Sequence, residues 1–229
     1  MRQIILDTET TGLEPTLGHR VIEIAAVEMI NRRFTGNHFH RYLNPDREID
    51  AGALQVHGIT SEFLQDKPRF RDIVDEFVEY VDGAELIIHN APFDVGFLNH
   101  ELGMLERERV AHYCPSVIDT LRMAKELHPG QKNNLDALCR RYQIDNSART
   151  LHGALLDAEL LAEVYLAMTR GQETLDMEVD EARPETDMNE GAGPRELLIL
   201  KATEEELEAH RQYLEDLDKA SKGACVWQG

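Results

Sequence analysis

The chain has 229 residues and a formal net charge of −19, with 43 acidic against 24 basic side chains. A chain of this length accommodates one sizeable core and an appendage, and it excludes two full domains. Because non-specific affinity for duplex DNA comes from Lys and Arg on phosphates, this charge excludes a protein that grips a duplex unaided.

The distribution of charge and cysteine adds two expectations. Residues 171–229 carry 16 acidic and 6 basic side chains, so the tail is disproportionately acidic. No apolar run approaches the roughly 18 residues of a membrane span. Cys114, Cys139 and Cys225 are scattered without CxxC spacing, which is typical of reduced thiols in a cytoplasmic protein.

The first residues predict a strand that ends in two carboxylates. Ile4–Leu6 is apolar, and Asp7 and Glu9 follow just before a turn that contains Gly12. Because side chains at i and i+2 of a strand share a face, the two carboxylates converge. Oxygen ligands without Cys or His favour Mg²⁺ or Mn²⁺ as the cation that neutralises them. An ordinary strand end in an acidic protein explains the pair equally well.

Two further strands are predicted next. Val21–Ile30 is rich in β-branched residues and too apolar for an exposed edge, which is typical of an interior strand. Asn31–Arg33 indicates a turn, and Phe34–Leu43 indicates a hairpin partner that ends at Asn44-Pro45. Three adjacent strands therefore open the fold.

A single histidine precedes the next predicted helix. Gly58 interrupts a short helical stretch and Thr60 is placed to cap the following one. Apolar spacing then predicts an amphipathic helix over 70–81, which ends at Gly83. His57 fits either a structural role or a place beside a nucleotide.

A fourth strand leads to a third carboxylate. Glu85–Asn90, with the apolar centre Leu86–Ile88, predicts a strand, and Pro92 suits the first turn of the helix that follows. Asp94 then lies near a helix N-terminus at the carboxyl end of a strand, where open α/β sheets bind ligands. A favourable interaction with the helix dipole explains an aspartate there as well.

An edge strand and two helices are predicted after residue 115. The strand is Ser116–Thr120, and the helices run on to His128 and from about Asn134 to Tyr142. A basic cluster stands out in this otherwise acidic domain, and it consists of Lys132, Arg140, Arg141 and Arg149. A solvated helix face explains Arg140 and Arg141.

The last long element of this domain brings a histidine and a fourth carboxylate. His152–Leu166 predicts a helix or a turn that enters one. Five residues on a helix correspond to about 140° of rotation, so His152 and Asp157 share no face if both are helical. They converge only if His152 lies on the approaching loop.

The tail divides into a linker and a short ordered segment. Residues 171–194 combine Gly, Pro and many acids with little apolar content, which is typical of a flexible linker. The final stretch has the apolar run Leu197–Leu200, and Thr203 with Glu206 forms a capping box for a helix to about Gly223. Trp227 lies close to the end.

Three segments together resemble the DEDDh 3′→5′ exonucleases. Ile5–Leu13 matches the first motif of that family, His89–Asp94 the second and Leu151–Ala158 the third. The likeness covers residues 1–170. The tail, which contains Cys225-Val226-Trp227 near its end, also resembles that of the proofreading (epsilon) subunits of bacterial DNA polymerase III.

The resemblance implies an α/β, RNase H-like fold with a mixed five-stranded sheet flanked by helices. It implies two divalent ions, Mg²⁺ or Mn²⁺, and a histidine as general base that takes a proton from the attacking water. The implied metal ligands are Asp7, Glu9, Asp94 and Asp157, and the implied base is His152. Contacts to the terminal nucleotide are implied for Thr8, Thr10 and His57, alongside Asp7, Glu9 and Asp157. Gly52, in the segment before His57, has no side chain with which to make such a contact.

The resemblance also implies partners and a domain organisation. Residues 1–170 form the exonuclease, 171–194 a flexible acidic linker, and 195–229 a segment that docks on the polymerase III alpha subunit. The substrate is a DNA 3′ end, and a small theta subunit is a further implied partner. Gln172–Met177 loosely resembles a sliding-clamp-binding peptide, although helix-end residues explain it nearly as well.

Two rival functions remain open at this point. An RNA-trimming exonuclease of the same family shares every catalytic residue, and the tail argues against it because such enzymes resemble this chain only through the catalytic domain. A non-catalytic scaffold that bridges polymerase parts is the second rival. The presence of all five polar motif residues argues against a scaffold.

Overall fold

The computed structural model describes residues 1–147, 149, 151–170 and 203–220. The chain divides into two compact units, Met1–Met177 and Glu178–Gly229, and each is described by itself. No helix within the described ranges has the length and apolar character needed to cross a membrane. The predicted linker, the Gln172–Met177 peptide, Leu197–Leu200 and Trp227 lie outside the described residues.

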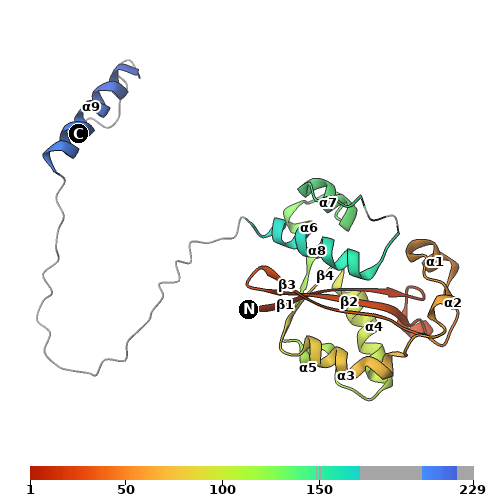
Figure 1. Cartoon of the computed structure of the whole chain (residues 1–229). Coiled ribbons are helices and arrows are strands. Elements are labelled where there is room, and N and C mark those ends of the chain that lie inside the picture. The colour runs from red at the N-terminus through yellow and green to blue at the C-terminus, as the bar shows by residue number, and fades with distance from the viewer. Residues whose placement is uncertain (148, 150, 171–202, 221–229) are drawn as a thin grey trace, which may run out of the picture. The chain divides into compact units, whose positions relative to one another are not determined.

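Five strands of the described residues form one mixed sheet in the order β3-β2-β1-β4-β5 (Figure 1). The pairs β1·β2 and β2·β3 are antiparallel, whereas β4 lies parallel to β1 and β5 parallel to β4. The mixed five-stranded sheet predicted from the sequence is therefore confirmed. The strands are β1 (Arg2–Thr10), β2 (Val21–Ile30), β3 (Arg33–Tyr42), β4 (Glu85–Ile88) and β5 (Ser116–Asp119).

Helices cover both faces of this sheet, with α3, α4 and α5 on one side and α6, α7 and α8 on the other (Figure 1). A parallel pair of strands needs a long crossover, and the helices between β1 and β5 supply it. The helices of the first unit are α1 (Ala51–His57), α2 (Ser61–Leu64), α3 (Phe70–Val81), α4 (Ala91–Met104), α5 (Val110–Tyr113), α6 (Thr120–Leu127), α7 (Leu135–Tyr142) and α8 (Ala154–Met168), together with the short 3-10 helix η1 (Pro15–Leu17).

The alternation of side chains along β1 joins the two layers of core. Ile4 and Leu6 pack into the cluster beneath α3 and α4, whereas Ile5 packs into the cluster beneath α7 and α8. Because successive side chains point to opposite faces, Asp7 and Glu9 continue the α8 side and Thr8 continues the α4 side. Burial of this strand on both faces explains why Ile4–Leu6, the residues just before the carboxylates, are all apolar.

Local signals in the sequence account for several helix ends. Gly58 ends α1 with φ of 71°, in the left-handed region that favours glycine. Thr60 caps α2, because its side chain accepts a hydrogen bond from the backbone N–H of Phe63 at 3.2 Å. The predicted amphipathic helix over 70–81 is α3, whose buried side lies against the sheet.

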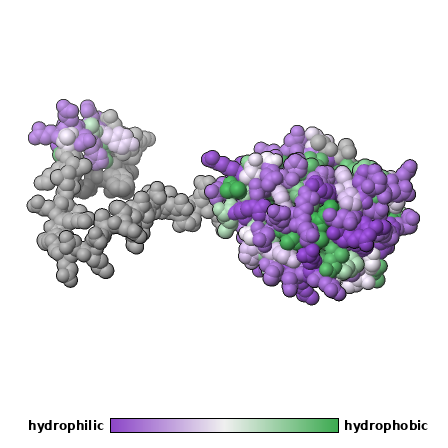
Figure 2. Space-filling view, turned by 60° about the horizontal axis from the view of Figure 1, so that its bottom comes forward, coloured by the Kyte–Doolittle hydropathy of each residue, from purple (hydrophilic) through white to green (hydrophobic). Residues whose placement is uncertain are grey.

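The surface of the first unit is dominated by charged and polar side chains, with apolar groups gathered in small patches on the face shown in Figure 2. The second unit is described over the helix α9 (Glu204–Ala220). Thr203 and Glu206 form the predicted capping box, since the Thr203 N–H donates to Glu206 Oε2 at 2.8 Å and the Glu206 N–H donates to Thr203 Oγ1 at 3.3 Å. Leu207 and Tyr213 are exposed on this helix.

Candidate active site

The first two carboxylates of the site stand at the end of β1. Asp7 is opposite Ala25 of β2 and Glu9 is opposite Glu23, and the register of the two strands shifts between Glu9 and Thr10. Such irregularities re-aim side chains and are common beside active sites. The shift therefore ends the regular pairing where the carboxylates leave the sheet.

The turn after β1 depends on a close approach that only glycine allows. A Cβ atom built on Gly12 would lie 2.3 Å from the ring of His19. That ring is buried and bonds Thr11 Oγ1 at 3.2 Å, while Thr10 Oγ1 donates to the Gly12 carbonyl at 2.6 Å. The Thr-Thr-Gly sequence thus holds the turn rigidly beside Glu9.

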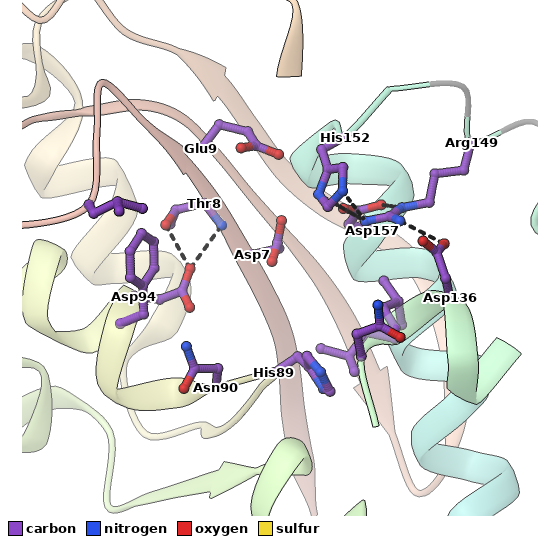
Figure 3. Close-up of a pocket in the computed structure, with 15 residues that line it drawn as sticks. Asp7, Thr8, Glu9, His89, Asn90, Asp94, Asp136, Arg149, His152 and Asp157 are labelled. Carbon is purple, nitrogen blue, oxygen red and sulfur yellow. Dashed lines mark hydrogen bonds and ion pairs between the residues drawn. The ribbon is translucent and has the colours of Figure 1, made fainter. Parts of the chain in front are cut away.

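The third carboxylate, Asp94, enters from the first turn of α4. Pro92 occupies that turn, as predicted, and the preceding Asn90 has φ of 66°. Asp94 is 3% exposed, and its Oδ1 accepts from the Thr8 backbone N–H at 3.1 Å and from Thr8 Oγ1 at 2.7 Å. Thr8 therefore ties the carboxylate of α4 to β1 between Asp7 and Glu9 (Figure 3).

The fourth carboxylate and the histidine meet at the start of α8. Gly153 is the N-cap of this helix, so His152 lies on the approaching segment and Asp157 in the first turns. The backbone N–H of His152 donates to the Val56 carbonyl of α1 at 3.2 Å. His152 Nδ1 comes within 3.4 Å of Asp157 Oδ2, which is the convergence that the sequence allowed only for a non-helical His152.

Arg149 and Asp136 join the site without having been predicted there. Arg149 Nε and Nη2 donate to the two oxygens of Asp157 at 2.5 and 2.6 Å, and Nη1 donates to Asp136 Oδ1 at 2.7 Å. The Arg149 side chain is 6% exposed, so this member of the predicted basic cluster is a buried partner of the site's carboxylates. The positions of basic residues along the sequence do not show which of them forms an ion pair with a buried carboxylate in the folded chain.

These side chains line one pocket of about 440 Å³, whose wall also includes His89, Asn90 and Phe93 (Figure 3). A second pocket of about 430 Å³ shares Thr8, Glu9, Leu13 and Phe93 with the first, so the two are halves of one cleft. Its remaining wall is formed mainly by Thr10, Gly12, Asp50, Gly52, Ala53, Val56 and His57. One half is rich in carboxylates and the other is largely apolar.

The carboxylate half has the donor set of a hard cation. In the described part of the chain, Glu9, His152 and Asp157 offer ligand atoms that all lie within 4.8 Å of one another. The two carboxylates of this group are the oxygen ligands that a hard divalent cation prefers. In the structure, the Arg149 guanidinium provides the positive charge beside Asp157.

The pKa values of the acids report the same crowding. Burial, and then the charges of Asp94 and Glu9, raise the pKa of Asp7 well above its usual range. Burial, and then Glu23, raise the pKa of Glu9 to about 8, and burial raises that of Asp94 to about 7. Neutralisation of this cluster by a cation relieves the repulsion.

Stability without metal is therefore expected to fall as pH rises. A carboxyl whose folded pKa is raised contributes stability that is complete below its unfolded pKa and is lost as pH passes through the folded value. For Glu9 that window runs from 4.5 to about 8. We expect a loss on the order of 5 kcal/mol, or roughly 10–20 °C in Tm, for this group in EDTA.

Thermal unfolding in EDTA at pH 5 and pH 8.5 measures this loss. Glu9→Gln is the matched control, because it keeps the shape of the side chain and removes its titration. The difference between wild type and variant isolates Glu9 from the other titrating groups. Parallel pH profiles for the two proteins would contradict the expectation.

Comparison with known proteins shows the family. Residues 4–165 match the exonuclease family model RNase_T. The chain is 53% identical to DNA polymerase III subunit epsilon of Salmonella typhimurium and 49% identical to that of Escherichia coli, in each case over 99% of this chain and 97% of the relative. The chain belongs to this family of exonucleases.

Solved structures share the fold of the first unit. Exonuclease X in complex with 5′ overhanging duplex DNA is 27% identical, with a TM-score of 0.58 over 74% of this chain and 92% of that one. The nuclease domain of 3′hExo, a DEDDh family member bound to rAMP, is 16% identical, with a TM-score of 0.64 over 75% and 92% of the two chains. The RNase H-like fold expected from the motifs is thus confirmed.

The family establishes the class of reaction. The chain is a metal-dependent 3′→5′ exonuclease. The donor set described above fits the divalent ion on which this family depends.

Proposed function

We propose that this exonuclease removes mispaired nucleotides from DNA 3′ ends as the proofreading subunit of DNA polymerase III. The observation that carries the proposal is the convergence of all three motifs on one cleft. Asp7 and Glu9 from β1, Asp94 from α4, and His152 with Asp157 at the start of α8 line the same pocket. The named relatives are subunits of a DNA polymerase.

The four carboxylates are proposed to hold two divalent ions, Mg²⁺ or Mn²⁺. When bound, such ions neutralise charge on the attacking and leaving oxygens of a phosphodiester and make water a better nucleophile. Two hard dications require several oxygen ligands, which Asp7, Glu9, Asp94 and Asp157 supply. Thr8 holds Asp94 in place through its two hydrogen bonds.

His152 is proposed as the general base. Its side chain is 46% exposed at the pocket and so is open to the attacking water. Burial, and then the Arg149 guanidinium, lower the pKa of His152, which favours the neutral imidazole that accepts a proton near pH 7. Arg149 Nη2 donates to His152 Nδ1 at 2.9 Å, so this hydrogen bond also helps to hold the imidazole ring in its orientation.

The apolar half of the cleft is proposed to receive the terminal nucleotide. His57 is 5% exposed, and its Nδ1 accepts from the Ile59 N–H at 3.0 Å. In the neutral ring the proton therefore resides on Nε2. This atom is buried beside the Thr10 backbone, and among the described residues it has no acceptor of good geometry. With Thr8 and Thr10 on the same wall, Nε2–H is a donor for the sugar or phosphate.

Release of mononucleotides from a 3′-mispaired DNA primer tests the proposed function. We expect release with Mg²⁺ or Mn²⁺ and none in EDTA, and faster release from the mispaired than from the paired end, because a frayed end enters the cleft more readily. An RNA strand of the same sequence is the control. Preferential digestion of RNA would favour the RNA-trimming alternative, and no release under any condition would favour the scaffold.

The C-terminal residues are proposed as the polymerase-docking part. We propose residues 1–170 as the exonuclease domain, 171–194 as a linker, and 195–229 as the segment that binds the alpha subunit. A segment of about 35 residues is too small to be stable alone without a partner, and α9 exposes Leu207 and Tyr213. Tethering supplies a high local concentration at the primer, which offsets the weak DNA affinity expected from a charge of −19.

Removal of the tail is expected to separate activity from assembly. A chain of residues 1–170 retains every residue of the cleft, so it should digest single-stranded DNA at a rate within about twofold of the full chain. It should fail to co-elute with the alpha subunit in gel filtration, where the full chain co-elutes. Co-elution of the shortened chain would place the docking surface on the exonuclease domain instead. The Gln172–Met177 clamp peptide and the theta subunit stay predictions.

A further inference from the structure

A buried carboxylate next to the cleft has no part in the proposed chemistry. Glu23 lies on β2, directly opposite Glu9 in the antiparallel register, so the two side chains share the face that α8 covers. Glu23 is 1% exposed. A carboxylate is almost never buried this completely unless it is paired, so its partners indicate its role.

The first partner is the start of the helix that carries Asp157. Glu23 Oε2 accepts a hydrogen bond from the backbone N–H of Ala154, the first residue of α8, at 3.2 Å. The N-cap residue Gly153 has no side chain to satisfy these N–H groups. Glu23 thus supplies from the sheet the capping carboxylate that α8 lacks in its own sequence, and its charge suits the helix N-terminus.

The second partner fixes the carboxylate itself. His40 of β3 holds Glu23 Oε1 through its Nε2 at 2.7 Å. The His40 ring packs edge-on against Tyr42, with ring centroids 4.9 Å apart, and burial followed by the Glu23 charge raises the pKa of Tyr42. Each oxygen of Glu23 therefore has its own partner, one on β3 and one on α8.

The position of Glu23 gives these contacts a consequence for catalysis. Ala154 lies two positions after His152 and three positions before Asp157, so the hydrogen bond to Glu23 anchors the backbone between these two groups. Glu9 lies directly opposite Glu23 in the register of β1 and β2. We propose that Glu23, fixed by His40, is a positioning residue that sets the distance of Asp157 and His152 from Glu9. This inference rests on the proposed roles of Asp157 and His152.

Two substitutions separate the charge of Glu23 from its hydrogen bond. Glu23→Gln keeps an oxygen that accepts from Ala154, whereas Glu23→Ala removes the contact altogether. In the full chain with saturating Mn²⁺, we expect kcat to fall about 10–100-fold in Glu23→Ala, with KM for a single-stranded DNA substrate within about twofold. Glu23→Gln should recover part of that loss. Calorimetric titration with Mn²⁺ alone should show about 10-fold weaker binding in Glu23→Ala.

Glu28→Gln is the matched control. Glu28 is a buried carboxylate on the same strand, and it accepts from Arg2 Nε at 2.6 Å, away from the cleft. Its loss should lower Tm and leave kcat and Mn²⁺ binding within about twofold of wild type. If Glu23→Ala lowers Tm and leaves both kcat and Mn²⁺ binding unchanged, or if Glu28→Gln lowers kcat equally, the positioning role is overturned.

An Asp157→Asn arm distinguishes this inference from the proposed site. Full activity of Asp157→Asn would remove the site assignment, whatever Glu23 does. An inactive Asp157→Asn together with a fully active Glu23→Ala, shown to be folded by its unfolding transition, would remove only the role of Glu23.

Discussion

Asp7→Asn is expected to reduce nucleotide release by at least about 10³-fold while the fold is kept. That factor corresponds to a loss of about 4 kcal/mol of transition-state stabilisation, a reasonable share of what bound metal ions contribute. Asn has the shape of Asp but lacks the charge that holds a dication. The rate is measured on a single-stranded DNA substrate with saturating Mg²⁺ and again with Mn²⁺.

The same variant is expected to be more stable than wild type without metal. Burial and four neighbouring carboxylates raise the pKa of Asp7, so at pH 8 its ionised form opposes folding. In EDTA at pH 8, Tm should therefore rise in Asp7→Asn. Added Mn²⁺ should stabilise wild type more than the variant, because only a protein that binds the ion gains from it. A Tm lower than wild type in EDTA, or a rate above a tenth of wild type, would contradict the metal assignment.

Asp157→Asn is the instructive comparison within the same cluster. From the sequence, removal of any of the four acids relieves repulsion, so all four variants should be no less stable in EDTA. The structure corrects this expectation for Asp157, because its carboxylate accepts two hydrogen bonds from the nearly buried Arg149. Loss of these charged contacts costs on the order of 2 kcal/mol, so metal-free Asp157→Asn should be less stable than wild type.

The sheet and the main site residues were predictable because local patterns determine them. The alternation Ile4-Ile5-Leu6 places Asp7 and Glu9 on one face whatever the rest of the fold does. Pro92 and the apolar strand before it similarly place Asp94 in the first turn of a helix. These assignments needed only the neighbours of each residue in the chain.

Arg149 and Glu23 were missed because their roles depend on tertiary contacts. Glu23 and Ala154 are 131 positions apart, and the sequence shows Glu23 only as one charge in an apolar strand. That charge was the signal available in the sequence, since a charged side chain in a strand buried on both faces requires a partner. For Arg149, its position three residues before His152 in the third motif was the available hint.

His152→Ala is expected to lower kcat by about 10²–10⁴-fold, the usual contribution of a general base. In wild type the rate should rise with pH as the imidazole loses its proton. Burial and Arg149 lower the pKa of His152 from 6.5, so the midpoint of this limb should lie below 6.5. The His152→Ala variant should lack this rise of rate with pH.

His128→Gln is the matched control. Burial also lowers the pKa of His128, but this histidine bonds Tyr142 outside the cleft, so the rise of rate with pH should persist in the control variant. A profile in His152→Ala that still rises through the same midpoint would assign the proton transfer to another group.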